Sequence, residues 1–206
     1  MIVVAACYPI ETRWMRRTRG VERVRTPVGE RAADALDLRH RSASLLLSTG
    51  FCGGVRADLR TGDLVLAECV IHGDEIIHVD PVLLNLARVT LEKSGYAVFV
   101  GPVVSLPTVA DRGAKGRLDE QGVLSVDMES GPMAGWASAH GAGFISLRAV
   151  LDEADVDVPF SPGASLLRSV LSHPLAALRA GRWAGKAGRR LGRALDALAS
   201  AMGEES

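Results

Sequence analysis

The 206-residue sequence is poor in aromatic residues and has no excess of charge of either sign. Phe, Trp and Tyr make up only 4% of the chain, so a core must be built mainly from Ala, Val and Leu. Lys plus Arg and Asp plus Glu number 24 each. Because the two charges balance, the composition gives no reason to expect nucleic acid as a partner. The hydrophobic fraction of 48% instead predicts a folded protein.

Cysteine and long apolar runs are also scarce. The three cysteines, Cys7, Cys52 and Cys69, are far apart, which fits neither a zinc site nor a disulfide framework, so we expect three buried thiols. No apolar run at the start of the chain is long enough to span a membrane, and residues 2–8 lack the preceding basic residues of a signal peptide. These absences predict a cytoplasmic protein.

Six apolar runs of strand length alternate with segments of helical pattern. Several runs are apolar throughout, which favours strands buried on both faces. The alternation predicts an α/β fold with a largely parallel sheet, and the length fits a single domain over residues 1–206. Strands are expected at 2–8, 44–49, 64–71, 96–106, 122–128 and 143–151, and helices at 29–40, 80–95 and 130–141.

The pattern changes near the C-terminus. Residues 158–202 are expected to form a basic helical extension packed on the domain, with a break at His173 and Pro174. Its cations precede the acid Asp196 and are Arg168, Arg179, Arg182, Lys186, Arg189, Arg190 and Arg193. The pattern is compatible with a solvated helix face, and also with a basic surface that meets anionic lipid or a partner.

Three carboxylates and one glycine-rich segment follow predicted strands. Glu11, Glu129 and Asp152 lie just past strands, and "STGFCGG" (48–54) is expected as a turn after another. In open α/β sheets, sites form at the carboxyl ends of the strands. Each feature also has a plain structural explanation, such as a tight turn, a carboxylate at a helix N-terminus or a cap. Together they predict a pocket in an α/β enzyme whose reaction these residues alone leave open.

Four segments occur in a characteristic order within residues 1–155. They are "ACYPIETRW", "LLLSTGFCGGVRADLRTGDLVLAECV", "VDMESGPMA" and "LRAVLDEAD". Together they resemble the motifs of the purine nucleoside phosphorylase and methylthioadenosine/S-adenosylhomocysteine nucleosidase superfamily. The resemblance implies a three-layer α/β/α fold with a central mixed sheet, a homo-oligomer, and cleavage of the N-glycosidic bond of an adenosine-type nucleoside. It implies no metal or organic cofactor, and inorganic phosphate as co-substrate if the enzyme is a phosphorylase.

The resemblance also implies residue roles. Asp152 would protonate the departing base, and Glu11 would orient or deprotonate the attacking water. Glu129 would accept hydrogen bonds from the ribose hydroxyls and Met128 would pack on the sugar, whereas Asp127 would point the other way and be structural. The other substrate-binding residues that the resemblance implies are Phe51, Cys52, Gly53 and Val109.

Three departures from the family pattern bear on the acceptor and the pocket. Ser48 stands where hexameric bacterial phosphorylases carry an arginine, so phosphate would need another partner, for which Arg13 is a candidate. Phe51 stands where many relatives carry a serine. The stretch after Glu11 is short, so part of the pocket wall would be missing or come from a neighbouring subunit. A nucleoside-binding protein without turnover is therefore an alternative of another class.

Within the superfamily, "VDMES", "AHGAGFISLRAVLDEAD" and the basic tail resemble the hopanoid-associated phosphorylases. That subgroup is linked to the release of adenine from adenosylhopane. The resemblance implies peripheral contact with a membrane through the basic helices. Methylthioadenosine/S-adenosylhomocysteine nucleosidase and futalosine hydrolase are the alternatives.

Overall fold

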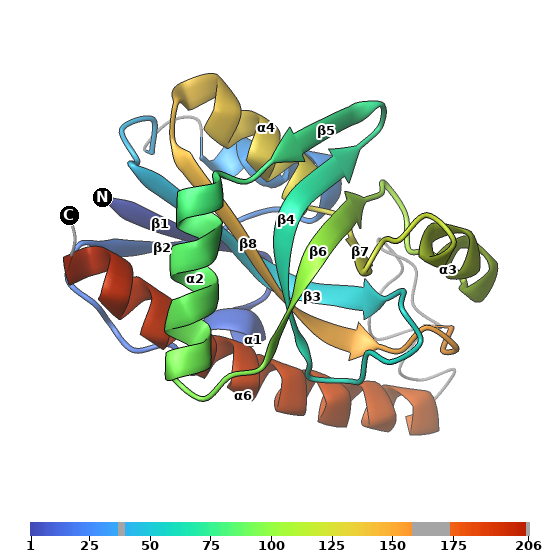
Figure 1. Ribbon diagram of the computed structural model, residues 1–206. Coiled ribbons are helices and arrows are strands. Elements are labelled where there is room, and N and C mark those ends of the chain that lie inside the picture. The colour runs from blue at the N-terminus through green and yellow to red at the C-terminus, as the bar shows by residue number, and fades with distance from the viewer. Residues whose placement is uncertain (37–39, 158–173, 205–206) are drawn as a thin grey trace.

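The computed structural model describes residues 1–36, 40–157 and 174–204 of the chain. Eight strands form one mixed sheet, and helices cover both of its faces (Figure 1). The strands are β1 (Ile2–Ala6), β2 (Val21–Arg25), β3 (Leu45–Gly54), β4 (Leu64–His72), β5 (Glu75–His78), β6 (Val98–Ser105), β7 (Ser125–Asp127) and β8 (Gly143–Asp152). The predicted three-layer α/β/α class with a mixed, largely parallel sheet is confirmed.

β3 is the strand on which the sheet is organised. It pairs in parallel with β1 and β8, and in antiparallel orientation with the short β7. β8 also pairs with β4, β4 with β6, and β6 with β7, so five strands close into a ring. β2 and β5 lie at the two ends of the strand order. The ring brings the carboxyl ends of β3 and β8 next to β7 and the helix that follows it.

The helices divide between the two faces of the sheet. They are α1 (Pro9–Thr12), the 3₁₀ helix η1 (Gly29–Ala35), α2 (Pro81–Lys93), α3 (Arg112–Asp119), α4 (Ser130–His140) and α6 (Pro174–Glu204). Side chains of η1 and α4 belong to one apolar cluster, and side chains of α2 and α6 belong to another. Figure 1 shows α2 and α6 on one side of the sheet, α4 on the other, and α3 beyond the ends of β6 and β7.

Neighbouring residues of β3 explain why its sequence is continuously apolar. Leu46 is buried in the cluster on the α4 face, whereas Leu45 and Leu47 are buried in the cluster on the α6 face. Successive strand side chains point to opposite faces, so a strand covered on both sides needs apolar residues at every position. All six strands predicted from such runs are present.

The prediction of a turn at 48–54 is wrong, because these residues continue β3. They pair with β8 from Ser48 opposite Ser146 to Gly53 opposite Asp152. Glycine weakens a strand only moderately, and here a buried partner strand supplies the hydrogen bonds. The glycines of this segment therefore do not interrupt β3, and they allow other groups to pack closely against it.

The helix predicted over 29–40 is a 3₁₀ helix that ends at Ala35, and residues 37–39 lie outside the described part of the chain. The other two predicted helices are present as α2 and α4. α2 begins at Pro81, where Asp80 accepts hydrogen bonds from the backbone N–H groups of Val82 and Leu83. That cap satisfies two donors that a helix start leaves unpaired.

α6 packs on the sheet with one face and exposes the other. Its buried residues include Leu191, Leu195 and Leu198, each 0% exposed. The first part of the predicted extension and residue 173 of the predicted break fall on residues 158–173, outside the described residues, and α6 begins at Pro174, the other residue of that break. The division of the chain into a 1–206 domain with a 158–202 extension stays a prediction. No helix in the described ranges is both long and apolar enough to cross a membrane.

Candidate functional site

A buried arginine occupies the middle of the polar site. Arg148 lies on β8 and is 1% exposed. Its Nε is 2.8 Å from the carboxylate of Asp127, and its Nη2 donates to Ser48 Oγ at 2.8 Å and to Ser130 Oγ at 2.9 Å. The Ser146 hydroxyl accepts a further hydrogen bond from Nε at 3.3 Å. A buried guanidinium needs such partners because an unpaired buried charge is costly.

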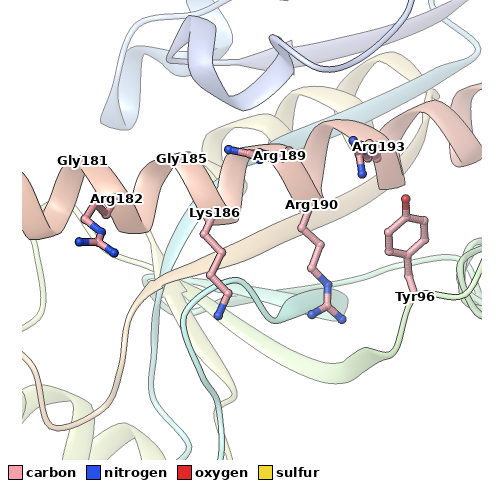
Figure 2. A pocket seen from close by; sticks show the side chains of 8 residues that line it. All are labelled: Tyr96, Gly181, Arg182, Gly185, Lys186, Arg189, Arg190 and Arg193. Atoms are coloured by element: carbon pink, nitrogen blue, oxygen red, sulfur yellow. The ribbon is translucent and has the colours of Figure 1, made fainter.

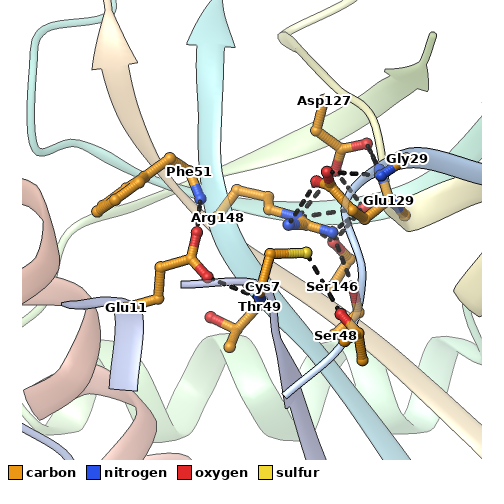
Figure 3. Close-up of polar contacts among 12 residues, drawn as sticks. Cys7, Glu11, Gly29, Ser48, Thr49, Phe51, Asp127, Glu129, Ser146 and Arg148 are labelled. Carbon is orange, nitrogen blue, oxygen red and sulfur yellow. Dashed lines mark hydrogen bonds and ion pairs between the residues drawn. The ribbon is translucent and has the colours of Figure 1, made fainter. Parts of the chain in front are cut away.

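Asp127 and Glu129 both face this guanidinium (Figure 3). The prediction that Asp127 points the other way is wrong, because the chain leaves the extended conformation at Glu129, the N-cap of α4. Asp127 Oδ1 accepts hydrogen bonds from the N–H groups of Glu129 and Ser130 at 3.2 and 3.1 Å. Asp127 thus holds both the start of α4 and Arg148.

Glu129 is held more loosely than Asp127. Its Oε1 accepts a hydrogen bond from Gly29 N at 3.2 Å, and its Oε2 lies 3.8 Å from Arg148 Nη1. Burial raises the pKa of Glu129, and the nearby Arg148 charge partly opposes that rise. Gly29 belongs to the segment between Glu11 and β3, so this short stretch, with β2 and η1, reaches the site.

Glu11 follows β1 and is 2% exposed. Its Oε2 accepts hydrogen bonds from Cys7 N at 2.9 Å and Tyr8 N at 2.8 Å, and its Oε1 accepts one from Phe51 N at 3.3 Å. Burial raises the pKa of Glu11 to about 7, although these N–H groups and Arg148 favour the ionised form. A carboxyl that titrates near neutral pH can exchange a proton with a bound water.

Gly50 of β3 lets Glu11 and Arg148 approach the strand. A Cβ at this position would lie 2.6 Å from Arg148 Nη1 and 3.0 Å from Glu11 Oε1. Only a residue without a side chain therefore leaves both charged groups in place.

Asp152 ends β8 and is 6% exposed. Its Oδ2 accepts a hydrogen bond from Lys115 Nζ at 2.5 Å. Burial raises the pKa of Asp152, and the charge and hydrogen bond of Lys115 oppose that rise. Asp152 contacts β3 at Gly53, where a Cβ would lie 3.1 Å from Asp152 Oδ2. Glu11 and Arg148 thus lie against β3 at Gly50, and Asp152 lies against it at Gly53.

The other predicted substrate-binding residues are spread around this strand. The ring of Phe51 packs with the apolar cluster on the α6 face, and the Cys52 side chain is buried in the cluster on the α4 face. Val109 is 41% exposed in the segment between β6 and α3. Met128 is half-buried close to Gly29. The substrate roles of these residues stay predictions.

Two residues of the site, Arg148 and Lys115, were not predicted from the sequence. Arg148 carried a signal, since it is the only charged residue within the apolar run 143–151. Lys115 gave no such signal in the sequence, because α3 is a polar helix in which a lysine is expected to be exposed. The three cysteines are buried and free, as predicted. In the parts of the chain that the structure describes, no three His, Cys, Asp or Glu side chains are grouped as metal ligands.

Comparisons with known proteins agree with this architecture. The family model of the phosphorylase superfamily matches residues 24–169. A search of curated proteins gave no match. Among solved structures, 5′-methylthioadenosine/S-adenosylhomocysteine nucleosidase from S. pneumoniae superimposes with a TM-score of 0.74 at 17% identity, covering 98% of this chain and 99% of that one. Futalosine hydrolase of Helicobacter pylori gives 0.75 at 15% identity and 97% of each chain. The nucleosidase from Neisseria meningitidis, in complex with methylthio-immucillin-A, gives 0.73 at 19% identity, over 96% of this chain and 97% of that one. At these identities the likeness concerns the fold.

Proposed function

Because the chain belongs to the phosphorylase superfamily, we propose that it cleaves the N-glycosidic bond of an adenosine-type nucleoside. The family predicted from the four motifs is confirmed by the match over residues 24–169, and with it the class of enzyme, a nucleoside phosphorylase or nucleosidase. The observation that carries the proposed reaction is the placement of three buried carboxyl groups around one strand. Glu11, Glu129 and Asp152 come from distant parts of the sequence: Glu11 and Arg148, the ion-pair partner of Glu129, approach β3 at Gly50, and Asp152 approaches it at Gly53.

The chemistry needs groups of this kind. When an N-glycosidic bond breaks, the sugar becomes oxocarbenium-like and the departing base gains negative charge. Asp152 is the proposed acid that protonates the base, and its burial favours the protonated form that this role requires. Glu129 is the proposed acceptor for the ribose hydroxyls, which would replace its long contact with Arg148 at 3.8 Å.

Glu11 is the proposed group that orients or deprotonates the attacking water. Its backbone hydrogen bonds fix the carboxylate, and a pKa of about 7 allows it to accept a proton near neutral pH. We propose water as the acceptor in preference to phosphate. Arg148 donates to Ser48 and Ser130 through Nη2, and its charge is already paired with the carboxylates of Asp127 and Glu129, which makes it a poor partner for a further anion such as phosphate. Arg13, the other candidate partner for phosphate, is exposed, and its guanidinium carbon lies 5.8 Å from the centre of the Trp14 ring.

The substrate that we propose is adenosylhopane, on the resemblance to the hopanoid-associated subgroup, and the alternatives are methylthioadenosine, S-adenosylhomocysteine and futalosine. We also propose that the protein is a homo-oligomer, on the resemblance to the superfamily as a whole. A nucleoside-binding protein without turnover is the second candidate. The ion pair between Lys115 and Asp152 favours it, because a lysine cation stabilises the ionised form of the proposed acid.

Peripheral membrane contact is the remaining part of the proposal. α6 exposes a row of cations beside Tyr96 that borders a surface hollow of about 660 Å³ (Figure 2). Because the apolar residues of α6 between Ala187 and Met202 pack in the core, contact of this part of the helix with a bilayer would be electrostatic and not insertive. We call Arg182, Lys186, Arg189 and Arg193 the basic face of α6.

Base release measured by chromatography tests the proposed reaction. We expect adenine or hypoxanthine release from at least one of these nucleosides, with no acceleration by phosphate. Asp152→Asn should still fold, at a cost in stability because Lys115 loses its counter-charge, and should lose about 10²–10⁴-fold in kcat, since the leaving group would depart unprotonated. Glu129→Gln should lower kcat/KM by weakening contact with the sugar.

Asp74→Asn is the matched control, because Asp74 is exposed between β4 and β5 and the substitution makes the same chemical change. An active Asp152→Asn variant would contradict the role of Asp152. A nucleoside that raises the Tm of the protein but releases no base would favour the binding protein. Acceleration by phosphate would contradict the choice of water.

A further inference from the structure

Lys115 is a buried cation that the proposed reaction does not use. It lies on α3 and is 1% exposed. Its ammonium group donates to Asp152 Oδ2 at 2.5 Å, to the Glu153 carbonyl at 2.9 Å and to the Val156 carbonyl at 3.2 Å. These three acceptors match the three hydrogens of an ammonium group. Asp152 supplies the counter-charge without which this lysine could not stay charged inside the protein.

The fold fixes both members of the pair. Asp111 caps α3 by accepting a hydrogen bond from Ala114 N at 2.7 Å. Asp157 accepts one from Arg112 N at 2.8 Å, which ties the start of α3 to the segment that follows β8. α3 and the segment after Asp152 are thus joined by backbone hydrogen bonds as well as by the lysine.

β3 closes the remaining side of the pair. At Gly53 a Cβ would lie 3.1 Å from Asp152 Oδ2 and 3.2 Å from Lys115 Cε. The carboxyl group and the end of the lysine side chain therefore lie side by side against β3 at Gly53, and a shift of Lys115 would free the carboxyl group to move.

We propose that Lys115 is a positioning residue for Asp152: its ammonium group holds the carboxyl against β3 and determines how readily that carboxyl takes up the proton that the leaving base needs. This inference rests on the proposed function, in which Asp152 is the acid. Burial alone would keep the carboxyl protonated to high pH, and a lysine cation alone would keep it ionised. The two opposing effects leave an acid that can be protonated without holding its proton too tightly.

The other titratable groups near the pair have partners of their own or carry no charge. Cys52 on β3 has its pKa raised to about 12 by burial, so its thiol is neutral at physiological pH. Glu153 accepts a hydrogen bond from Thr61 N at 3.1 Å, and Asp157 is bonded to the start of α3. Of the described residues, Lys115 is the one that forms an ion pair with Asp152.

Lys115→Met tests this inference, because methionine keeps the length of the side chain and removes the charge. In the empty protein, the carboxyl carbon of Asp152 is followed by NMR as the pH is varied, and its signal is identified by its absence in Asp152→Asn. We expect the pKa of Asp152 to rise by about one to three units in Lys115→Met. The pH above which kcat/KM falls should rise by a similar amount, because kcat/KM reports the free enzyme.

Lys93→Met is the matched control, since Lys93 is exposed at the end of α2. It should change neither the titration nor the pH profile. If Lys115→Met leaves the titration of Asp152 where it is in the wild type, or lowers kcat/KM equally at all pH values, the lysine is only structural and the inference is wrong.

The NMR titration and the base-release assay test the role of Lys115 and the proposed reaction separately. The NMR titration needs no turnover, so a wild-type protein that releases no base contradicts the reaction while the titration still decides the role of Lys115. If Lys115→Met does not fold, the wild type is used alone. The side-chain NMR signal of Lys115 should then change at the pH where Asp152 titrates, and a signal that stays constant there overturns the inference.

Discussion

Single glycines determine how close the charged groups of the site can come to β3. Gly50 leaves room for Glu11 and Arg148, and Gly53 leaves room for Asp152 and Lys115. Both positions are surrounded by side chains that the fold holds from other elements. A methyl group at either place would compete directly with a charged group.

Gly50→Ala should damage the site more than it damages the core. The new Cβ would lie 2.6 Å from Arg148 Nη1, so the guanidinium must move away from its partners. We expect a loss of about 1–3 kcal/mol in the free energy of unfolding and a loss of most base release. Urea unfolding and the chromatographic assay measure the two effects.

Gly135→Ala is the control for this substitution. Gly135 lies on α4, and no atom would lie within 4 Å of the added Cβ. Alanine also favours a helix over glycine, so this variant should be as stable as the wild type or more stable. If Gly50→Ala is as stable and as active as Gly135→Ala, the close approach of Glu11 and Arg148 to β3 is not needed for function.

At this scale the sequence predicted where acids lie but not what they contact. Glu11, Glu129 and Asp152 were expected at strand ends, and each is buried there. Patterns of apolar residues indicate which face a side chain takes and contain no information about partners. The pairs of Asp127 with Arg148 and of Asp152 with Lys115 depend on contacts between distant segments, so neither was predicted.

Among the elements, α6 approaches α1 and the residues just after it at two glycines. A Cβ at Gly188 would lie 2.8 Å from the Ile10 carbonyl oxygen, and one at Gly192 would lie 3.0 Å from Trp14 Cβ. Ile10 precedes Glu11, so the position of α6 bears on the residue proposed to handle the water. The C-terminal helix is therefore part of the support of the site.

Gly188→Ala and Gly185→Ala form a matched pair on α6. Gly185 has no atom within 4 Å of the added Cβ, so alanine there should stabilise by up to about 1 kcal/mol through helix propensity. Gly188→Ala has the same gain in propensity but pushes α6 away from α1, and we expect a net loss of about 1–3 kcal/mol. Thermal unfolding measures both, and equal Tm values would show that α6 does not press on α1.

The strands that escaped prediction are those at the ends of the strand order. β2 has the sequence VERVR and is largely exposed, and β5 has only four residues. Short or charged strands avoid aggregation at an open sheet edge, but they lack the apolar run by which the other strands were recognised. The interior strands were predicted because burial on both faces leaves a strong sequence pattern.

For the whole molecule, the prediction concerns the basic face of α6. The full chain should float with phosphatidylcholine vesicles that contain phosphatidylserine and not with phosphatidylcholine alone, and added salt should weaken the binding. Replacing Arg182, Lys186, Arg189 and Arg193 by Glu should abolish flotation, since each cation near an anionic surface contributes about 1 kcal/mol.

The control changes the same net charge elsewhere, at the exposed residues Arg31, Lys93, Arg112 and Arg117. It should float like the wild type. Equal flotation of both variants, or no flotation of the wild type, would contradict a membrane role for α6.

The overall class of the molecule followed from alternating strands and helices, whereas the order of its strands did not. The sequence contains no signal that β8 pairs with both β3 and β4, and this double pairing closes the ring. Strand order depends on contacts between residues that are far apart in the chain, and local patterns do not encode them.

The pairing of β3 with β8 also has a consequence for synthesis of the chain. Thr49 and Leu147, which share a hydrogen bond across these strands, are 98 positions apart. Chains emerge from the ribosome N-terminus first, so the edge of β3 that pairs with β8 stays unpaired until β8 has been synthesised. Parallel pairing across such a distance is slow to form. During that interval the nascent chain is open to association with its neighbours on the same polysome and is a natural client for a chaperone.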